Sequence, residues 1–515
     1  MEKAYTKSVA STFDEFTAVR EYLEQVIGQL QTPEALKRRH DETERTIQQE
    51  GQELCRLLFQ AALDVRANEE VRRECVTAED NVVRTHFRKD CRRKIASVFG
   101  EVTYRRNGYS HPMGGSVFPL DEALNMPKRK YTYGLRECVS LAVCQNAFES
   151  SLEGLSTLIA GKIPKRQAEE LVVEASTDFD AFYAQRAITP VQSQSTVLVM
   201  SQDGKGITLR HEDLREATRK AAEKEPHTLS TRLSSGEKRN RKRMATVAAV
   251  YDMAPHVRET SDVISRPGEE GEARRNDAPK AENKRVWASI EKEMEGVTEE
   301  LVQEAMRRDP NRERPWVMLI DAHKDQIKVV KRVFKRHGIQ AVLILDFIHV
   351  LEYLWRAAWC FFDSSDKEQA KEAEQWVLEK AGAILDGRSG NVAAGIRIKA
   401  KSYALSAKKR KTIGKVAKYL TNHTEMLHYD HYMQQGYPIA TGVIEGACRH
   451  LIADRFEITG ARWSLKTAEG ILRLRAIHSS GDWEPYQAFH KKQEWKRNHL
   501  QRFHESERKT MAWDK

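Results

Sequence analysis

The chain lacks the cysteine pairs and the long apolar runs that mark several large classes of protein. Its seven cysteines are scattered along 515 residues, and no two form a CxxC pair. This pattern excludes a disulfide framework and predicts reduced, mostly structural thiols. The longest apolar runs, such as AVLILDFIHVL, are too short and too interrupted to cross a bilayer. The first residues, MEKAYTKSVASTFDEF, have no apolar segment of the secretory type. We therefore expect an intracellular protein with no membrane partner.

The sequence also lacks the glycine-rich signatures of nucleotide-binding folds. The segment DGKGI does not have the spacing of a P-loop, and no GxGxxG follows an expected strand. Positive charge, by contrast, is in excess, with 85 Lys and Arg against 75 Asp and Glu and a net charge of +10. The length predicts roughly two to four domains, and the basic balance predicts an anionic partner, for which nucleic acid is the best fit.

The N-terminal region, residues 1–98, has the apolar spacing of helices. Apolar residues recur three and four apart in FDEFTAVREYLEQVIGQL and ELCRLLFQAALDV. These helices are a candidate dimerisation arm, and helices that pack on their own domain remain equally open. SVFGEVTYRRNGY predicts a strand or hairpin, and VFPLDEAL predicts a loop that leads into a helix.

Residues 99–190 are expected to form a helical DNA-binding region. Between residues 131 and 176 a helical pattern is broken once, where Gly161 would end one helix and Pro164 would lie in the first turn of the next. The second helix opens with Lys165 and Arg166, which a helix-turn-helix would place in a major groove. An ordinary corner between two helices is the alternative.

Three strands are expected next, in TVLVMSQD, RMATVAAVYDM and HVRETSDVI. The excursion between the first two contains KRNRKR, whose cations contact phosphates or simply face solvent. Those cations are Lys238, Arg239, Arg241, Lys242 and Arg243. A Gly, Pro and Glu-rich stretch at 266–284 predicts a linker, and a helix is expected from about 286 to 308.

A parallel βαβ unit is the clearest local pattern in the chain. WVMLIDA and IQAVLILDFIHV are apolar strands, and HKDQIKVVKRVFKRHG between them is an amphipathic helix that ends at a glycine. The following residues, 351–436, lack strand signals and predict an all-α insertion. The catalytic core would then comprise residues 191–350 and 437–480, followed by a charged tail at 481–515.

Three acidic residues lie where a ribonuclease H-like fold would bring them together. Asp203 ends the first strand and Asp321 ends the fourth, and these two strands are neighbours in that fold. Glu445, on the helix opened by TGVIEG, would supply a third carboxylate. Three carboxylates at one point repel each other unless divalent cations hold them. Two Mg²⁺ or Mn²⁺ ions there could activate water or a 3′-hydroxyl for attack on a phosphodiester.

Each acid also has a structural explanation. Asp203 before glycine suits a turn, Asp321 suits a helix cap, and Glu445 suits the first turn of a helix. Asp346 competes as the second acid, but it ends the fifth strand, which is about 4.8 Å farther from Asp203. With His349 it would support the site or join the sheet to the insertion.

Four blocks resemble the core of bacterial insertion-sequence transposases of the ISKra type, relatives of the mutator-like DDE transposases. They are SQDGKGI, LIDAHKDQ, LDFIHVLEYLW and GVIEGACRHLIADRFEITGARWS. The resemblance implies that Asp203, Asp321 and Glu445 form the DDE triad. It also implies that Asp346 and His349 form the supporting element of mutator-like enzymes, and that Trp463 belongs to a family block. The CxxC pair that many members carry before PLDEAL is absent, which puts a zinc knuckle in doubt.

The resemblance implies a function on double-stranded DNA. Such an enzyme binds the inverted-repeat ends of its element, cleaves strands and joins them to target DNA. A homodimer or higher oligomer, in the cytoplasm and associated with the nucleoid, is implied by analogy. The alternatives are a ribonuclease H-like nuclease or resolvase that cuts branched DNA, and a non-catalytic DNA-binding protein derived from a transposase.

Overall fold

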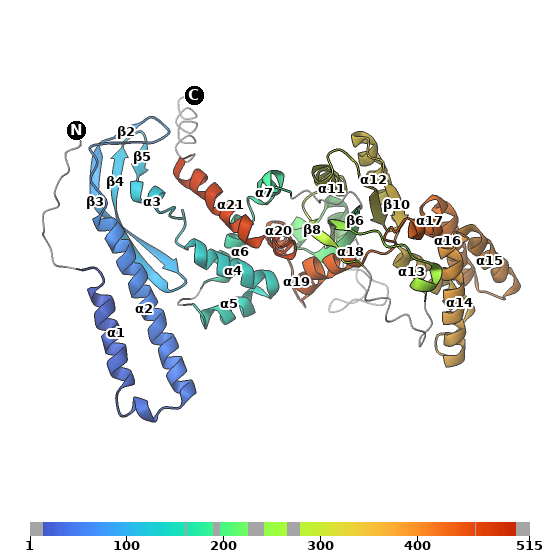
Figure 1. Cartoon of the computed structure of the whole chain (residues 1–515), viewed down its shortest axis with the longest axis horizontal. Helices are drawn as coiled ribbons and strands as arrows, with labels where there is room; N and C mark the ends of the chain where they lie inside the picture. Colours follow the sequence, from blue (N-terminus) through green and yellow to red (C-terminus); the bar gives the residue numbers. More distant parts are fainter. Residues whose placement is uncertain are drawn as a thin grey trace. The chain divides into compact units, whose positions relative to one another are not determined.

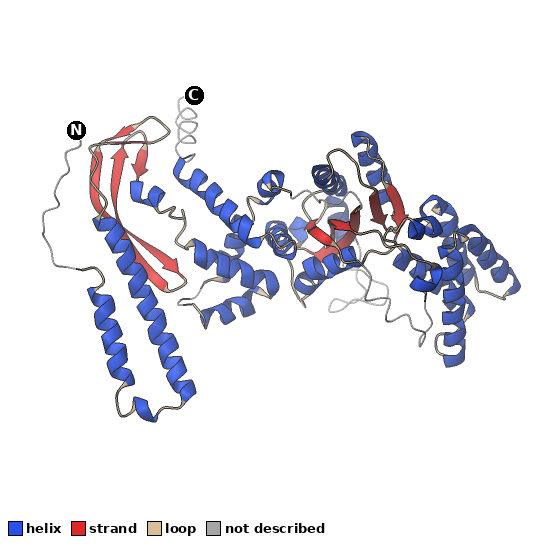
Figure 2. Ribbon diagram, in the orientation of Figure 1, coloured by secondary structure: helices blue, strands red, loops and turns tan. Residues whose placement is uncertain are grey.

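The computed structural model divides into two compact units, each of mixed helix and strand (Figures 1 and 2). Unit 1 comprises residues 1–182 and 484–515, and unit 2 comprises residues 183–483. The mixture of helices and strands that the sequence predicted, an α/β class, is confirmed at this coarse level. The described residues are 14–159, 161, 163–188, 196–224, 241–264, 279–458 and 460–500.

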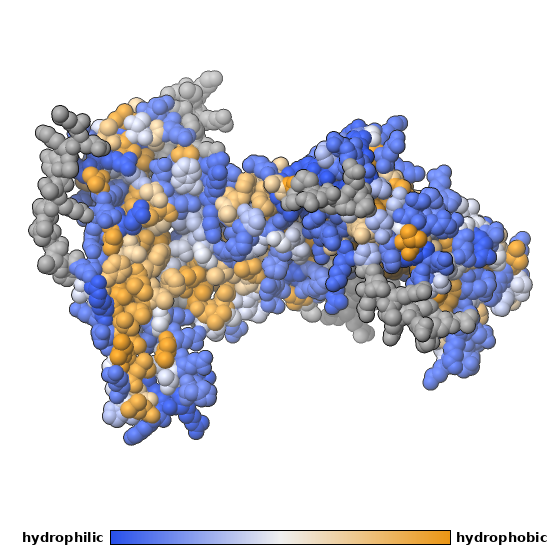
Figure 3. Space-filling view, in the orientation of Figure 1, coloured by the Kyte–Doolittle hydropathy of each residue, from blue (hydrophilic) through white to orange (hydrophobic). Residues whose placement is uncertain are grey.

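Unit 1 begins with the two helices that the apolar spacing predicted. They are α1 (Thr17–Leu30) and α2 (His40–Asn68), and the short η1 (Ala35–Lys37) lies between them. The Tyr22 hydroxyl donates to Glu50 across the hairpin at 2.5 Å. Several large apolar side chains along this hairpin stay exposed, as Figure 3 shows. They are Leu23, Ile27, Leu36, Ile47 and Leu58.

A three-stranded antiparallel sheet follows the helical hairpin. Its strands are β3 (His86–Ser97), β4 (Gly100–His111) and β5 (Gly115–Val117). The expected hairpin is therefore present, although its first strand begins well before residue 97. A two-stranded ribbon, β1 (Val76–Thr77) with β2 (Val83–Arg84), precedes it. The sheet packs on α2 through Leu63, Ile95, Val102, Tyr104 and Met126.

The helical part of unit 1 is broken twice, so the expectation of a single break is wrong. After α3 (Pro119–Ala123) come α4 (Tyr133–Gln145), α5 (Phe148–Ser156) and α6 (Lys165–Ala175). The first break follows from the extended backbone of Asn146, a residue that competes poorly for helical positions. The second begins after Ser156, before Gly161, and Pro164 caps α6 rather than entering its first turn.

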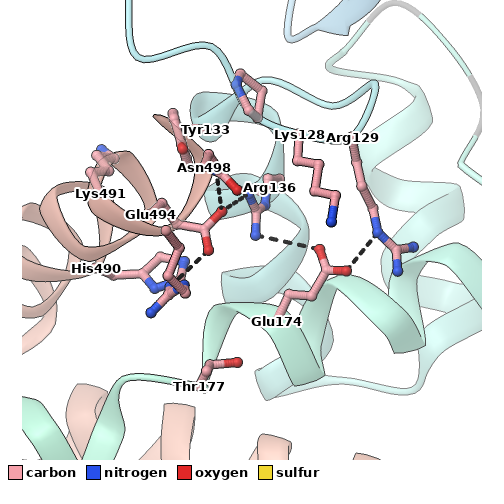
Figure 4. A network of polar contacts seen from close by, with 12 residues as sticks. Lys128, Arg129, Tyr133, Arg136, Glu174, Thr177, His490, Lys491, Glu494 and Asn498 are labelled. Atoms are coloured by element: carbon pink, nitrogen blue, oxygen red, sulfur yellow. Dashed lines mark hydrogen bonds and ion pairs between the residues drawn. The ribbon is translucent and has the colours of Figure 1, made fainter. Parts of the chain in front are cut away.

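The C-terminal helix returns to unit 1. The boundary between the units falls within α7 (Phe179–Gln185), after Phe182, and α21 (Trp483–Trp495) continues into η5 (Lys496–Leu500). Figure 4 shows the buried Arg136 guanidinium between two carboxylates, 3.5 Å from Glu174 and 3.2 Å from Glu494. This arrangement ties the last helix to α4 and α6 by charge.

Unit 2 is built on a five-stranded sheet in the order β10-β9-β6-β7-β8. The strands are β6 (Val197–Thr208), β7 (Lys242–Met253), β8 (Glu282–Ser289), β9 (Trp316–Ile320) and β10 (Val342–Leu345). The first three pair antiparallel, whereas β6 with β9 and β9 with β10 pair parallel. The first and fourth strands are therefore neighbours, as expected.

The third strand lies farther along the chain than its prediction. Residues 256–264 were expected as a strand, but they contain the short helix α9 (Thr260–Val263). Their backbone is used elsewhere, because the amides of His256 and Arg258 donate to Gly436 and Met433. The true third strand, β8, lies where a linker and the start of a helix were expected. Its apolar run is short, and only its second half is buried.

Helices complete unit 2. The expected βαβ unit is confirmed, with α12 (Lys324–His337) ended by Gly338 at a φ of +60°. In the segment expected as an all-α insertion, residues 351–436, every regular element is a helix. The remaining helices are η2 (His211–Asp213), α8 (Glu216–Lys224), α11 (Met294–Arg308), α13 (Phe347–Phe361), α14 (Lys367–Leu385), α15 (Ser389–Ser402), α16 (Ala407–Asn422), η3 (Thr424–Met426), α17 (Tyr429–Gln434), α18 (Gly442–Ala447), η4 (Cys448–Ala453), α19 (Asp454–Phe456) and α20 (Leu465–Ser479).

The sequence predicted no membrane-spanning helix and no disulfide framework. Among the described residues, no helix has both the length and the apolar content needed to span a membrane. All seven cysteines lie in the described ranges, and none of them is joined to another by a disulfide bond.

A buried network of ion pairs joins β8 to α11. Glu304 accepts from Arg285 at 2.6 Å and from Arg308 at 2.9 Å, and all three side chains are almost fully buried. Burial alone would raise the pKa of Glu304, but the two guanidinium groups hold it below its usual value. The carboxylate is therefore charged in the folded state and pairs with both buried cations.

Replacing Glu304 by Gln would remove the carboxylate that both buried guanidinium groups share, and would leave Arg308 with its longer contact to Asp252 at 3.8 Å. We expect a loss of about 3 kcal/mol or more of unfolding free energy, measured by urea titration of tryptophan fluorescence. The control Glu299→Gln removes partly exposed ion pairs with Arg336 and His337, which should cost less than about 1 kcal/mol. Equal effects of the two substitutions would contradict the role assigned to the network.

Candidate active site

Three aspartates follow the paired ends of three neighbouring parallel strands. The ladder between β6 and β9 ends at Gln202 and Ile320, and that between β9 and β10 ends at Ile320 and Leu345. The next residues on the three strands are Asp203, Asp321 and Asp346. Because parallel strands in register end at the same edge, these carboxylates lie side by side at one edge of the sheet.

The strand that carries Asp203 does not end there, contrary to the sequence prediction. β6 continues to Thr208, and its pairing with β7 runs without interruption to Lys242. What ends just before Asp203 is the pairing of β6 with its other neighbour, β9, whose last pair is Gln202 with Ile320. A Cβ on Gly206 would lie 3.0 Å from the Lys242 side chain, so the glycine keeps this extension paired closely. Asp203 is therefore fixed in an ordered strand rather than a turn.

Asp321 lies half-buried between β9 and α12. Its carboxylate accepts from the backbone amide of His323 at 3.1 Å, and His323 is the residue that precedes the helix. Burial raises the pKa of Asp321, and the nearby charge of Asp203 raises it further. The two aspartates therefore interact electrostatically, as like charges at one site do.

Asp346 is buried, and its carboxylate is used for local structure. It accepts from the amide of Ile348 at 2.9 Å as the cap of α13, from His349 Nδ1 at 3.3 Å, and from the Thr441 hydroxyl. These partners occupy the carboxylate oxygens and leave Asp346 poorly placed to act as a ligand. The preference for Asp321 as the second acid gains support from this geometry.

Glu445 lies on α18 between two contacts that hold this helix against the sheet. Thr441, which precedes the helix, binds Asp346, and the Cys448 thiol at its other end donates to Asp203 Oδ2 at 3.2 Å. Glu445 itself is exposed. Burial raises its pKa, with further contributions from Asp346 and Asp203. The third predicted acid therefore belongs to the same electrostatic cluster.

Cys448 was treated as structural in the sequence, and its contact with Asp203 was missed. Burial raises the pKa of its thiol, and the Asp203 charge raises it further, so the thiol keeps its proton and donates. The sequence signal that could have indicated this contact is the position of Cys448 three residues after Glu445, because residues at that spacing lie on the same face of a helix. The chain then forms a π-helical turn, η4, a distortion frequent at functional sites.

The acidic cluster has the donor atoms of a metal site, but not the spacing of one. The charge of Asp203 raises the pKa values of Asp321 and Glu445, and the three carboxylates supply the hard oxygen donors that Mg²⁺ or Mn²⁺ prefers. Within the described ranges, however, no three His, Cys, Asp or Glu side chains lie close enough together to hold an ion as they stand. The chemistry of the donors therefore fits a divalent cation, and their spacing would have to contract around it.

Trp463 lies at the far end of β6 rather than beside the acids. Its backbone pairs alongside the residues at the end of the strand, since it bridges Leu209 and its carbonyl accepts from the Arg210 amide at 2.8 Å. Its ring is buried, and the Arg455 guanidinium lies 4.5 Å from a ring centroid. Trp463 therefore supports the extension of β6 that carries Asp203.

The predicted DNA-binding cations fall into two groups. In unit 1, Lys165 pairs with Glu149 at 2.8 Å, and Arg166, which is largely exposed, lies 3.5 Å from Glu170. In unit 2, Lys242 is exposed, whereas the Arg243 guanidinium donates to the backbone carbonyl of Ile290 at 2.9 Å. Lys238 and Arg239 lie outside the described residues, and Arg241 precedes β7. Their contact with DNA stays a prediction.

Comparisons with known proteins give a limited match. Residues 38–227, well under half of the chain, match the model of an Uncharacterised protein family (UPF0236). No curated protein matches the chain. Among solved structures, the Drosophila P element transposase strand transfer complex aligns with 9% identity and a TM-score of 0.22, covering 68% of this chain and 80% of that chain. A score this low carries no argument about the fold.

His349 gives the site a charge that can be tested by pH. Its hydrogen bond to Asp346 raises the pKa of its imidazole to about 9, against the opposing effect of burial. A raised pKa stabilises the fold fully below the unfolded value of about 6.5, and that stabilisation is lost as pH rises through 9. We expect the stability difference between the wild type and His349→Gln to be larger near pH 6 than near pH 10. Urea titrations at both pH values measure it, and a difference that grows with pH would contradict the assignment.

Proposed function

We propose that this protein is a DNA transposase of the ISKra type, which cleaves DNA strands and transfers them to target DNA with divalent cations. One observation carries the proposal: Asp203 and Asp321 follow the shared ladder of β6 and β9, and Glu445 reaches the same cluster from α18. The sequence resemblance assigns these three residues as the catalytic acids.

The order of the strands supports a ribonuclease H-like core within this proposal. Three consecutive strands pair antiparallel, and the fourth joins the first in parallel and is followed by a helix and a fifth parallel strand. That topology brings the first and fourth strands together at the centre of the sheet. It is the arrangement in which acids far apart in sequence can share one substrate phosphate.

In the proposed reaction, Asp203, Asp321 and Glu445 supply the oxygen ligands. Two bound Mg²⁺ or Mn²⁺ ions would lower the pKa of an attacking water or 3′-hydroxyl and stabilise the leaving oxygen. The chain's own groups prepare the site. Cys448 donates to one oxygen of Asp203, and this orients the carboxylate. Asp346 holds Thr441 and thereby the helix that bears Glu445.

His349 contributes a charge to the same cluster. Its pKa near 9 keeps it protonated at neutral pH, and its charge lowers the pKa values of Asp321 and Glu445. The carboxylates are therefore kept closer to their ionised forms, which are the forms that bind cations. Asp346 and His349 act in this proposal as positioning residues.

Double-stranded DNA is the proposed partner, in the form of transposon ends and target DNA. The net charge of +10 supports an anionic partner. Unit 1, with the α5 and α6 helices, is proposed to bind the element ends through Lys165 and Arg166. Because two ends must be held together during transposition, we also propose that the protein works as a homodimer or higher oligomer.

Removing any of the three acids should abolish strand cleavage. Asp203→Asn, Asp321→Asn and Glu445→Gln preserve side-chain volume while removing charge, so we expect a loss of about a hundredfold or more in cleavage of labelled inverted-repeat DNA. DNA binding, measured by gel shift, should persist because phosphate contacts lie elsewhere. The control Asp325→Asn changes an exposed acid of α12 and should cleave normally.

Strand transfer into a target plasmid separates the transposase from a nuclease that only cuts. A wild type that cuts ends without joining them would favour the nuclease. Full cleavage by all three acid variants would remove the proposed site.

Metal binding can be measured without activity. We expect full-length protein to bind Mn²⁺ at this site, with affinity reduced at least about tenfold in Asp203→Asn and Asp321→Asn. Electron paramagnetic resonance of free Mn²⁺ measures the bound fraction, and Asp325→Asn is the matched control. Unchanged binding in both ligand variants would show that these carboxylates do not hold the ion.

A further inference from the structure

A pocket of about 370 Å³ lies in unit 1, built from elements that the carboxylate site does not use. It is lined by the sheet through β3, β4 and β5, by α3 with the loop that follows it, and by η5. The lining includes Arg106, Phe118, Asp121, Lys128 and Asn498. Its volume is at the lower end of the range found for small-molecule sites.

Arg106 gives this pocket an unused donor. Its side chain is nine-tenths buried, and its guanidinium lies over Phe118, with Cζ 4.0 Å from the ring centroid. Nε lies 3.1 Å from Asp121 Oδ1. Nη1 is buried and has no hydrogen-bond partner among the described residues. A buried charged donor without an acceptor is costly, and an anionic ligand would remove this cost.

The neighbouring arginine is used to build the pocket rather than to bind in it. The β3–β4 register pairs Arg93 with Tyr104 and Cys91 with Arg106, so Arg93 and Arg106 share one face of the sheet. The Arg93 guanidinium donates to three successive carbonyls, beginning with Pro127 at 2.6 Å. These bonds fix the loop that carries Lys128.

Lys128 adds a second cation to the lining. Its side chain is exposed, and Figure 4 draws it without a contact to the residues around it. The Arg136 network fixes the opposite wall, because Glu494 accepts from both Arg136 and Asn498. The pocket is therefore held from both sides before any ligand enters.

The mixture of charges favours one class of ligand. Arg106 and Lys128 suit a phosphate, whereas the carboxylates of Asp121 and Glu122 would repel a simple anion and accept from a donor group. A nucleotide carries both kinds of group, a phosphate and a base with N–H donors. We propose that this pocket binds a nucleotide, with its phosphate on Arg106 and Lys128 and its base edge toward the acids and Asn498. The nucleotide is either free or one unit of a single strand.

Isothermal titration of the full-length protein tests this site. The probes are deoxyadenosine 5′-monophosphate, deoxyadenosine without phosphate, and an oligo-deoxyadenosine strand of about a dozen nucleotides. We expect the phosphate-bearing probes to bind and the nucleoside not to bind. Arg106→Gln should weaken binding about tenfold or more, because it removes a charged hydrogen bond. Binding of the mononucleotide identifies a free nucleotide as ligand, and binding of the strand alone identifies a strand.

Lys128→Gln keeps the test open if Arg106→Gln fails to fold, since Lys128 is exposed and a smaller loss of affinity is expected. The matched control is Lys130→Gln, two residues along the same loop and outside the pocket, which should bind as the wild type does. The proposal would be overturned if the wild type bound neither the mononucleotide nor the strand. It would also be overturned if both pocket variants bound them as tightly as the wild type does. Asp203→Asn should retain nucleotide binding, so this site stands or falls separately from the proposed catalysis.

Discussion

The register of β9 with its two neighbours is the constraint on which the candidate site depends. β9 is only five residues long, and it pairs with β6 on one side and β10 on the other up to the same residue, Ile320. Backbone hydrogen bonds thereby place three carboxylates at one level. A slip of one residue would turn each side chain to the opposite face. The uniformly buried side chains of β9 resist such a slip, because both of its faces pack against other elements.

The second constraint is the position of α18, which is far from β10 in sequence but is held near the end of that strand. Residues 351–436 separate β10 from α18, yet the Phe347 amide donates to Ile439 and Thr441 binds Asp346. The insertion therefore leaves and returns at nearly the same point. Glu445 can reach Asp203 because this return is fixed by hydrogen bonds and not by the length of the insertion. Cys448 completes the closure on the other side.

Local periodicity made much of this predictable. The apolar strands around α12, the glycine that ends that helix and the helical insertion all have patterns that depend on neighbours in sequence. The third strand was misplaced because its identity depends on pairing with β7, which no local pattern encodes. Three of the eight residues of β8 are charged, and it is a strand because Val286 and Trp287 are buried against the sheet. The extension of β6 past Asp203 was missed for the same reason, since Gly204 and Gly206 suggest a turn until β7 is present.

The return of α21 to unit 1 has a consequence for the order in which the protein is made. The ribosome releases α4 and α6 long before it reaches Glu494, so Arg136 and the pocket near Asn498 wait for their partners while all of unit 2 is synthesised. During that interval the first unit is an unfinished domain in which Arg136 has Glu174 but lacks its second carboxylate partner, Glu494. A chain truncated after Trp483 would lose only C-terminal residues. Those residues nevertheless belong to unit 1, which is otherwise formed by the N-terminal part of the chain.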